Sequence, residues 1–189
     1  ITQQVTINLV AGPATQIGMV NAPRASTSSG HDLGAPEVAL QDQFGNRVLS
    51  DDYLHPGTSV TATITSGDLG VLGGATQVTA LDGLATFSDL TLAGLVNTNY
   101  VITFTAYGLT SLSSSNLVVT PGDAYVLVET VMSTQAVYST RSGSDFSDQP
   151  RLELRDEQGN VLTNFDGTVT PHLGRNSTSI DDRLVNSSP

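Results

Sequence analysis

The carboxylates of this sequence are the residues best suited to chemistry, and calcium binding is the chemistry they suggest. Five aspartates in predicted loops are candidate metal ligands: Asp51, Asp52, Asp123, Asp145 and Asp148. Calcium takes several oxygen ligands, often at spacings such as D-x-D-x-D-G, and no stretch of the chain has that spacing. We therefore expect any Ca²⁺ site to lie at a junction between domains, where Asp123 would join loop carboxylates of the neighbour. Solvated loop carboxylates are the preferred interpretation of these residues, and calcium binding is the alternative.

Nucleophilic catalysis needs a base and a nucleophile that converge in space, and the sequence offers no such set. The three histidines, His31, His55 and His172, fall in different predicted loops or strands. In the stretch SSGHDLG, Ser29, His31 and Asp32 are too close in sequence to point at one another as a triad. The stretch GVLGG lacks the lysine and the following helix of a phosphate-binding loop. We predict that the chain is not an enzyme and has no catalytic or cofactor-binding residues.

The charge of the chain excludes several classes of partner. Its net charge is −11, with 18 acidic residues against 7 basic ones, all of them arginine. Scattered arginines in such excess of acid cannot neutralise a phosphate backbone or an anionic membrane surface. No run approaches the roughly 20 apolar residues of a membrane span. The absence of cysteine excludes a disulfide framework and thiolate chemistry. We expect no nucleic-acid partner and no membrane insertion.

A short phrase occurs twice and organises the chain. PEVALQDQFGNRVL, residues 36–49, returns as PRLELRDEQGNVL, residues 150–162. An aspartate followed by Gly-Asn can accept hydrogen bonds from the backbone of its own turn, while Gly or Asn takes a positive φ. Upstream, AGPATQIGMV (11–20) aligns with PGDAYVLVET (121–130). The repeated residues are predicted to have a structural role in turns, and they are Asp42, Gly45 and Asn46, and then Asp156, Gly159 and Asn160.

The elements that position these turns are predicted to be strands. β-branched and alternating apolar residues indicate strands at 37–41, 59–64, 76–81, 84–92, 100–107 and 116–120, with a further strand beginning near Val48. Turn residues separate them, and no window has a helical period. About seven short strands in roughly a hundred residues is typical of an immunoglobulin-like β-sandwich. We expect an all-β fold of tandem sandwiches with essentially no helix.

The spacing of the repeated residues also predicts the domain boundaries. Residues 12–121 form one complete immunoglobulin-like repeat, and residues 122–189 form part of a second. Residues 1–11 resemble the strand that closes the complete repeat, so we expect them to close a preceding one. In this interpretation the stretch TPGDA is a short linker that limits bending between repeats.

Several of these residues together resemble the bacterial immunoglobulin-like repeats of the invasin and intimin type, also found in large adhesins and S-layer proteins. The matching residues beyond the Asp-x-x-Gly-Asn turns are Gly83, Ala85, Phe87, Tyr100, Val119, Thr120 and Gly122. The resemblance implies a structural or spacer module of an exported bacterial cell-surface protein, hence an extracellular location. Neighbouring repeats or other copies of the chain would be its partners. The alternative is an adhesive module that binds a host surface or glycan through loops such as SSGHDLGAP and SDDYLHPG.

Overall fold

The computed structural model describes residues 7–8, 10–49, 57–130, 143–144 and 150–170, and over these residues the protein is all-β. The described residues form fourteen strands and no helix, so none of them lies in a helix that could cross a membrane. The prediction of an all-β chain is therefore confirmed. The strands are β1 (Gln16–Asn21), β2 (Ser26–Ser28), β3 (His31–Asp32), β4 (Glu37–Gln41), β5 (Ser59–Ser66), β6 (Val71–Gly73), β7 (Gln77–Thr79), β8 (Leu84–Thr86), β9 (Thr91–Ala93), β10 (Val101–Ala106), β11 (Leu112–Ser113), β12 (Val118–Thr120), β13 (Val126–Glu129) and β14 (Leu152–Arg155).

These strands form several small sheets. One sheet has the order β1-β4-β8 and the largest has the order β11-β10-β5-β7. A third has the order β3-β9-β6, and β2 pairs with β12. Every strand pairing is antiparallel except that of β2 with β12, which is parallel. The last pair, β13 with β14, forms a separate two-stranded ribbon.

Residues 12–121, which we call the main body, contain one hydrophobic core. Strands β1, β4 and β8 contribute side chains to it, and so do β5 and β10 of the largest sheet. Along β5 the buried residues are Val60 and Ala62, which is the alternation expected of a strand with one face toward a core. The rings of Phe87 and Phe104 meet at a centroid distance of 5.3 Å within the core, and both side chains are fully buried. Both of the larger sheets are therefore anchored to the same apolar interior.

The chain departs from the strand prediction in three ways. Strands β1, β2, β3, β6 and β11 lie outside the predicted ranges. The segment expected as one strand at 84–92 is divided into β8 and β9, which belong to different sheets. A turn lies between them, and in it the carboxylate of Asp89 accepts a hydrogen bond from the Ala75 N–H (3.0 Å). The strand expected near Val48 is reduced, over the described residues, to a bridge between Arg47 and Gln41.

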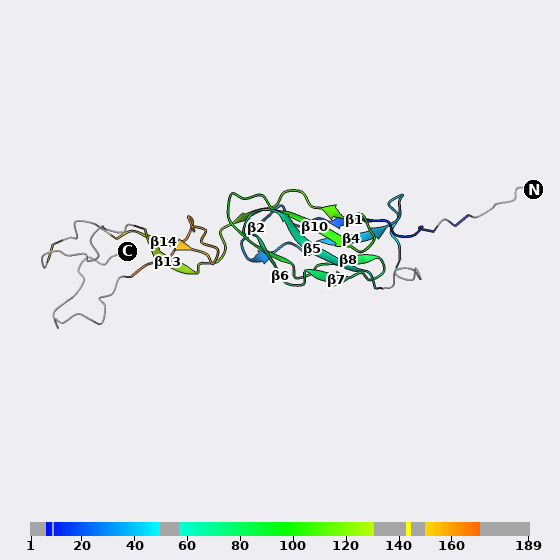
Figure 1. Cartoon of the computed structure of the whole chain (residues 1–189). Coiled ribbons are helices and arrows are strands. Elements are labelled where there is room, and N and C mark those ends of the chain that lie inside the picture. The colour runs from blue at the N-terminus through cyan, green and yellow to red at the C-terminus, as the bar shows by residue number, and fades with distance from the viewer. Residues whose placement is uncertain (1–6, 9, 50–56, 131–142, 145–149, 171–189) are drawn as a thin grey trace, which may run out of the picture.

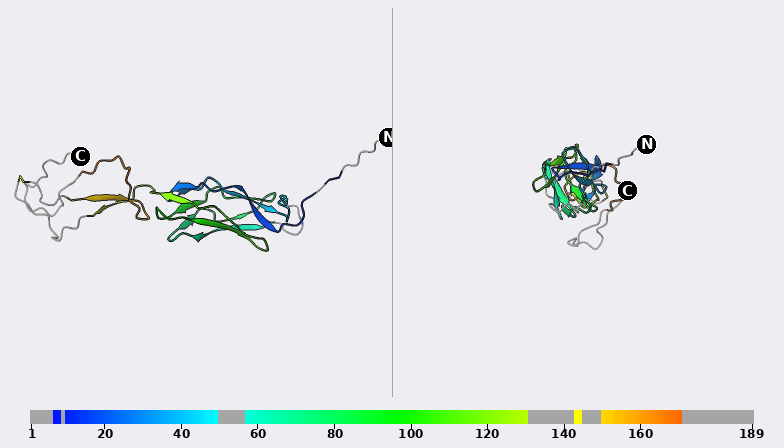
Figure 2. Two further views of the ribbon diagram at one scale, coloured as in Figure 1. Left: turned by 90° about the horizontal axis from the view of Figure 1, so that it is seen from above. Right: turned by 90° about the vertical axis from the view of Figure 1, so that its right-hand side faces the viewer.

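The β13–β14 ribbon repeats the pairing of β1 with β4. In the ribbon Val126 lies opposite Arg155, and in the main body Gln16 lies opposite Gln41. The next three pairs follow the same register in both places. The ribbon projects beyond one end of the main body, whereas the segment that leads into β1 lies at the opposite end (Figures 1 and 2). The repeated sequence thus forms the same local structure at two places along the molecule.

Candidate functional site

The first turn, residues Asp42–Asn46, is built around one buried carboxylate. Asp42 Oδ1 accepts hydrogen bonds from the N–H groups of Phe44 and Asn46, both at 2.9 Å. Its Oδ2 accepts from the Asn46 side-chain amide and from the Gly12 N–H, both at 3.0 Å. Gly45 takes the positive φ, at 85°. The carboxylate therefore holds both its own turn and the segment that leads into β1.

The second turn, residues Asp156–Asn160, has the same set of bonds. Asp156 Oδ1 accepts from the N–H groups of Gln158 (3.0 Å) and Asn160 (2.8 Å). Its Oδ2 accepts from the Asn160 side-chain amide and from the Gly122 N–H, both at 2.8 Å. Gly159 has a φ of 88°. In each turn glycine supplies the positive φ, so the asparagine is present for its side-chain amide, which bonds to the carboxylate.

These donors shift the ionisation of both carboxyl groups. The Asn46 amide and the Gly12 N–H, joined by two further backbone donors, lower the pKa of Asp42 from 3.8 to about 2. Burial of Asp156 raises its pKa, but the Gly122 N–H and the groups of Asn160 and Gln158 outweigh that effect, and the pKa lies below its ordinary value. Both groups are therefore charged acceptors at neutral pH, and hydrogen bonds to a charged acceptor are the stronger kind.

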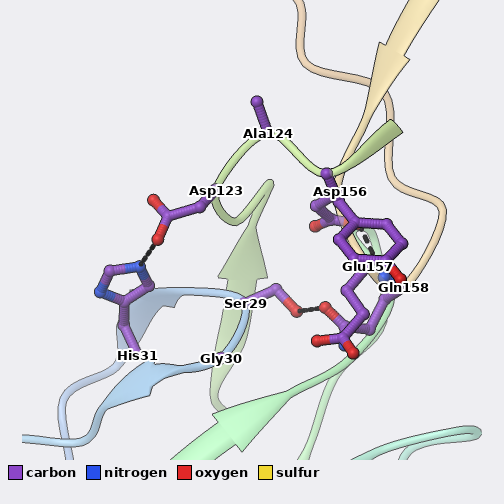
Figure 3. A pocket seen from close by; sticks show the side chains of 9 residues that line it. Ser29, Gly30, His31, Asp123, Ala124, Asp156, Glu157 and Gln158 are labelled. Atoms are coloured by element: carbon purple, nitrogen blue, oxygen red, sulfur yellow. Dashed lines mark hydrogen bonds and ion pairs between the residues drawn. The ribbon is translucent and has the colours of Figure 1, made fainter. Parts of the chain in front are cut away.

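The second turn also contacts the main body. The Asn160 side-chain amide donates to the Gly94 carbonyl, and its Oδ1 accepts from the Val96 N–H, both at 2.9 Å. Gln158 Oε1 lies 2.9 Å from the Ser29 hydroxyl, in position to accept from it (Figure 3). We call this contact, together with Gly122, the joint. It connects the ribbon to the main body through side-chain bonds as well as through the chain itself.

Hydrogen bonds within the main body hold the segment that Asn160 contacts. The Ser29 hydroxyl is buried and accepts from the Gly94 N–H (2.9 Å). The Tyr100 ring is fully buried, and its hydroxyl accepts from the Leu95 N–H at 2.6 Å. These bonds hold residues 94–96, the segment after β9, so that its backbone groups face Asn160. A rigid backbone that presents paired donors and acceptors loses little freedom when the second turn binds to it.

A pocket of about 240 Å³ lies beside the joint. Its wall includes His31, Asp123, Glu157 and Gln158, and His31 Nε2 lies 3.4 Å from Asp123 Oδ2 (Figure 3). Both of these side chains are well exposed, so solvent weakens their attraction. The loop SSGHDLGAP, which the sequence suggested as a binding loop, thus supplies residues to this pocket.

The structure describes only one of the five predicted metal ligands, Asp123. Asp123 lies between the main body and the ribbon, and it faces His31 rather than a second carboxylate. Asp156 lines the same pocket, yet each of its two oxygens already accepts two N–H donors. Among the described residues, no group of three or more His, Cys, Asp or Glu side chains is placed to hold a metal ion. The other candidates, Asp51, Asp52, Asp145 and Asp148, lie outside the described residues, where calcium binding stays a prediction.

The sequence identified the two turns but missed their partners. Ser29 and residues 94–96 lie far from Asn160 along the chain, and nothing in their sequence marks them as a contact surface. One signal was available: the Asn after Gly persists in both copies although Gly alone would satisfy the turn. A scan against protein-family models found no match for the chain, and neither did a search of curated proteins.

Proposed function

We propose that this chain is a structural spacer segment of an exported bacterial cell-surface protein, such as an S-layer, surface filament or adhesin stalk. Its units would be immunoglobulin-like β-sandwich domains in tandem, with residues 12–121 as one complete unit and 122–189 as part of the next. Residues 1–11 would close a unit before it. The role of each unit is mechanical: it is a rigid body that sets the distance and angle to its neighbours.

The joint is the observation that carries this proposal. The second turn fixes the linker through the Gly122 N–H and fixes the main body through Gly94 and Val96. The buried pair of Asp156 and Asn160 therefore does three things: it closes its own turn, it holds the linker at Gly122, and it binds the ribbon to the main body. A spacer needs this combination, because a flexible linker would let successive units rotate freely.

Two further features support the sandwich and the surface location. Sheets β1-β4-β8 and β11-β10-β5-β7 share one apolar core, as the two layers of a sandwich do. The surface is polar but weakly charged, with only 13% charged residues and no cysteine, a composition common in exported proteins. Together with the sequence resemblance to bacterial immunoglobulin-like repeats, these features favour a module of an array over an isolated binding domain.

Rigidity of the joint is the property to measure. A Cβ at Gly122 would overlap the carbonyl oxygen of Ser29, whereas a Cβ at Gly12 would meet only Asp42, at 3.8 Å. We expect Gly122→Ala to loosen the joint and the matched Gly12→Ala to leave it unchanged. Because the chain has no cysteine, nitroxide labels can be placed on Tyr107→Cys in the main body and Arg151→Cys beside β14.

The distance distribution between the two labels is the readout. A spacer should give one narrow distribution, broadened by Gly122→Ala and not by Gly12→Ala. A broad distribution in the otherwise unmodified protein would show that the units move freely and would contradict the proposal.

The pocket beside the joint favours a second candidate, an adhesive module for a glycan or host surface. Polar side chains around a concavity suit a sugar's hydroxyl groups, and His31 and Asp123 are both exposed there. For this function, glycan binding should be detectable by titration with the intact protein and should be lost in the double variant His31→Ala, Asp123→Ala. Binding that persists in the double variant would remove the pocket from consideration.

A further inference from the structure

We propose that the outer face of the first turn, formed by Phe44 and Asn46, is a docking site for the end of another unit built like residues 12–121. The second turn shows the occupied state of such a face. There Asn160 is 5% exposed because Gly94 and Val96 cover it. The proposal rests on the proposed spacer function and assigns a partner to a surface that the described residues leave uncovered.

The two turns are equivalent in every internal contact but not in exposure. The buried carboxylates Asp42 and Asp156 are each 2% exposed and accept the same four donors. Asn46, however, is exposed where Asn160 is buried. Within the described part of the chain, the Asn46 side-chain oxygen accepts no hydrogen bond, and its amide donates only to Asp42. The polar groups that make the joint at Asn160 are therefore present and unused at Asn46.

Geometry at the linker supports the same occupant. The Gly12 N–H binds Asp42 as the Gly122 N–H binds Asp156, so the chain enters both turns along the same side. At Gly122 a neighbouring backbone, the Ser29 carbonyl, comes so close that a side chain would not fit. At Gly12 no such neighbour is present among the described residues, although the residue is again glycine. The described residues around Gly12 leave room for a side chain, so they do not explain why residue 12 is glycine. A second backbone packed against Gly12 in the assembled array would explain it.

The expected partner surface is defined by the joint. It presents a carbonyl at the position of Gly94, an N–H at the position of Val96 and a small buried hydroxyl at the position of Ser29. Phe44 occupies the position of Gln158 and is 79% exposed. Phenylalanine cannot accept a hydrogen bond from the hydroxyl, so at this face it would instead add apolar contact. The first joint would thus keep the two asparagine bonds and replace the third with burial of the ring.

The test is a chain in which a second copy of residues 12–121 is joined directly in front of Gly12 of the natural protein, in place of residues 1–11. The core residues all lie within that segment, so the added copy has its own interior. Labels on Tyr107→Cys of the leading copy and Val20→Cys of the following copy report the new junction. Val20 is 53% exposed in β1, which makes it accessible to a label.

We expect a distance distribution as narrow as that of the natural joint. We expect Gly12→Ala to leave the natural joint unchanged. In the extended chain it should broaden the distance distribution, as Gly122→Ala should at the natural joint. Asn46→Ala should speed amide exchange at Val96 of the leading copy about tenfold, the loss of one hydrogen bond of ordinary net strength. Phe44→Gln, which introduces the residue of the second turn, should leave the distribution narrow.

Two results would overturn the proposal. One is a broad distribution in the extended chain, or a narrow one that Gly12→Ala does not alter. The other is self-association of the natural chain that Asn46→Ala abolishes, which would assign the face to a second copy of the protein. In either case a natural joint that is narrow and sensitive to Gly122→Ala would still support the spacer function, so the two proposals can fail separately.

Discussion

At the scale of single residues, the central device is an aspartate whose two oxygens each accept two N–H donors. The side-chain amide of Asn46 or Asn160 binds this carboxylate within its own turn. At the second turn the Asn160 amide also donates to the Gly94 carbonyl, which extends the network to another segment. The donors in this network bind the charged form of the aspartate more strongly than its protonated form. Stability that depends on the turns should therefore vary with pH.

We expect acid to weaken the first turn in a defined window. The folded pKa of Asp42 is about 2, below the ordinary value of 3.8. A lowered pKa means that the carboxylate contributes its full stabilisation above about pH 3.8 and loses it as the pH falls through about 2. Asp156 should act in the same direction.

Thermal unfolding followed from pH 6 to pH 2 would measure this effect. Asp42→Asn should unfold at a lower temperature at neutral pH and should show a smaller decrease on acidification. If wild type and variant lost stability in parallel across the window, the carboxylate's network would not contribute as inferred.

At the scale of elements, the turn between β7 and β8 packs closely against β4 and the segment that follows it. Asp82 and Gly83 have φ values of 47° and 71°, as the two central residues of a type I′ hairpin turn do. The Gly83 carbonyl accepts from the Leu40 N–H at 2.8 Å. A Cβ on Gly83 would overlap the Val48 carbonyl oxygen. The glycine is thus required by both its φ and its neighbour.

Gly83→Ala should therefore destabilise the main body far more than a matched substitution at another left-handed glycine. Gly108 has a φ of 74° and no atom within 4 Å of the added Cβ, so Gly108→Ala isolates the backbone strain, about 1–2 kcal/mol. The overlap at Gly83 should add about 1–3 kcal/mol. Urea unfolding of the two variants measures the difference, and equal losses would show that the backbone near Val48 yields without cost.

Elements were the part of the structure most accessible from sequence. Alternation predicted β5, and the β-branched run at 101–106 predicted β10, because side-chain period and strand geometry are linked locally. The division of 84–92 between two sheets could not be predicted, since β8 pairs with β4 whereas β9 pairs with β3 and β6, all distant in sequence. The turns were predictable for the same local reason as the strands. Their binding to Ser29, Gly94 and Val96 was not, because it depends on how distant segments meet.

At the scale of the whole molecule, the joint couples the ribbon to the main body through a small number of polar contacts. Asn160 supplies two of them, to Gly94 and Val96. A hydrogen bond of this kind contributes about 0.5–1.5 kcal/mol net. The joint should therefore be rigid yet separable without unfolding the core, in which none of the joint's side chains takes part.

Asn160→Ala should release the ribbon while the main body stays folded. Amide exchange at Val96 should accelerate, and that at Phe104, in the core strand β10, should not. Asn46→Ala is the matched control in the natural chain, because it removes the corresponding bond within the first turn and none at the joint. Unchanged exchange at Val96 in Asn160→Ala would contradict the contact.

The equality of the two turns has a geometrical consequence for any longer array. If each unit is fixed to the next by the same Asp-Asn pair and the same linker glycine, one rotation and one translation relate every successive pair of units. Repetition of a single such operation generates a screw axis, so the array would be a regular superhelix with a constant pitch. Because the joint engages backbone groups at Gly94 and Val96, that pitch would be insensitive to most substitutions on the units' surfaces.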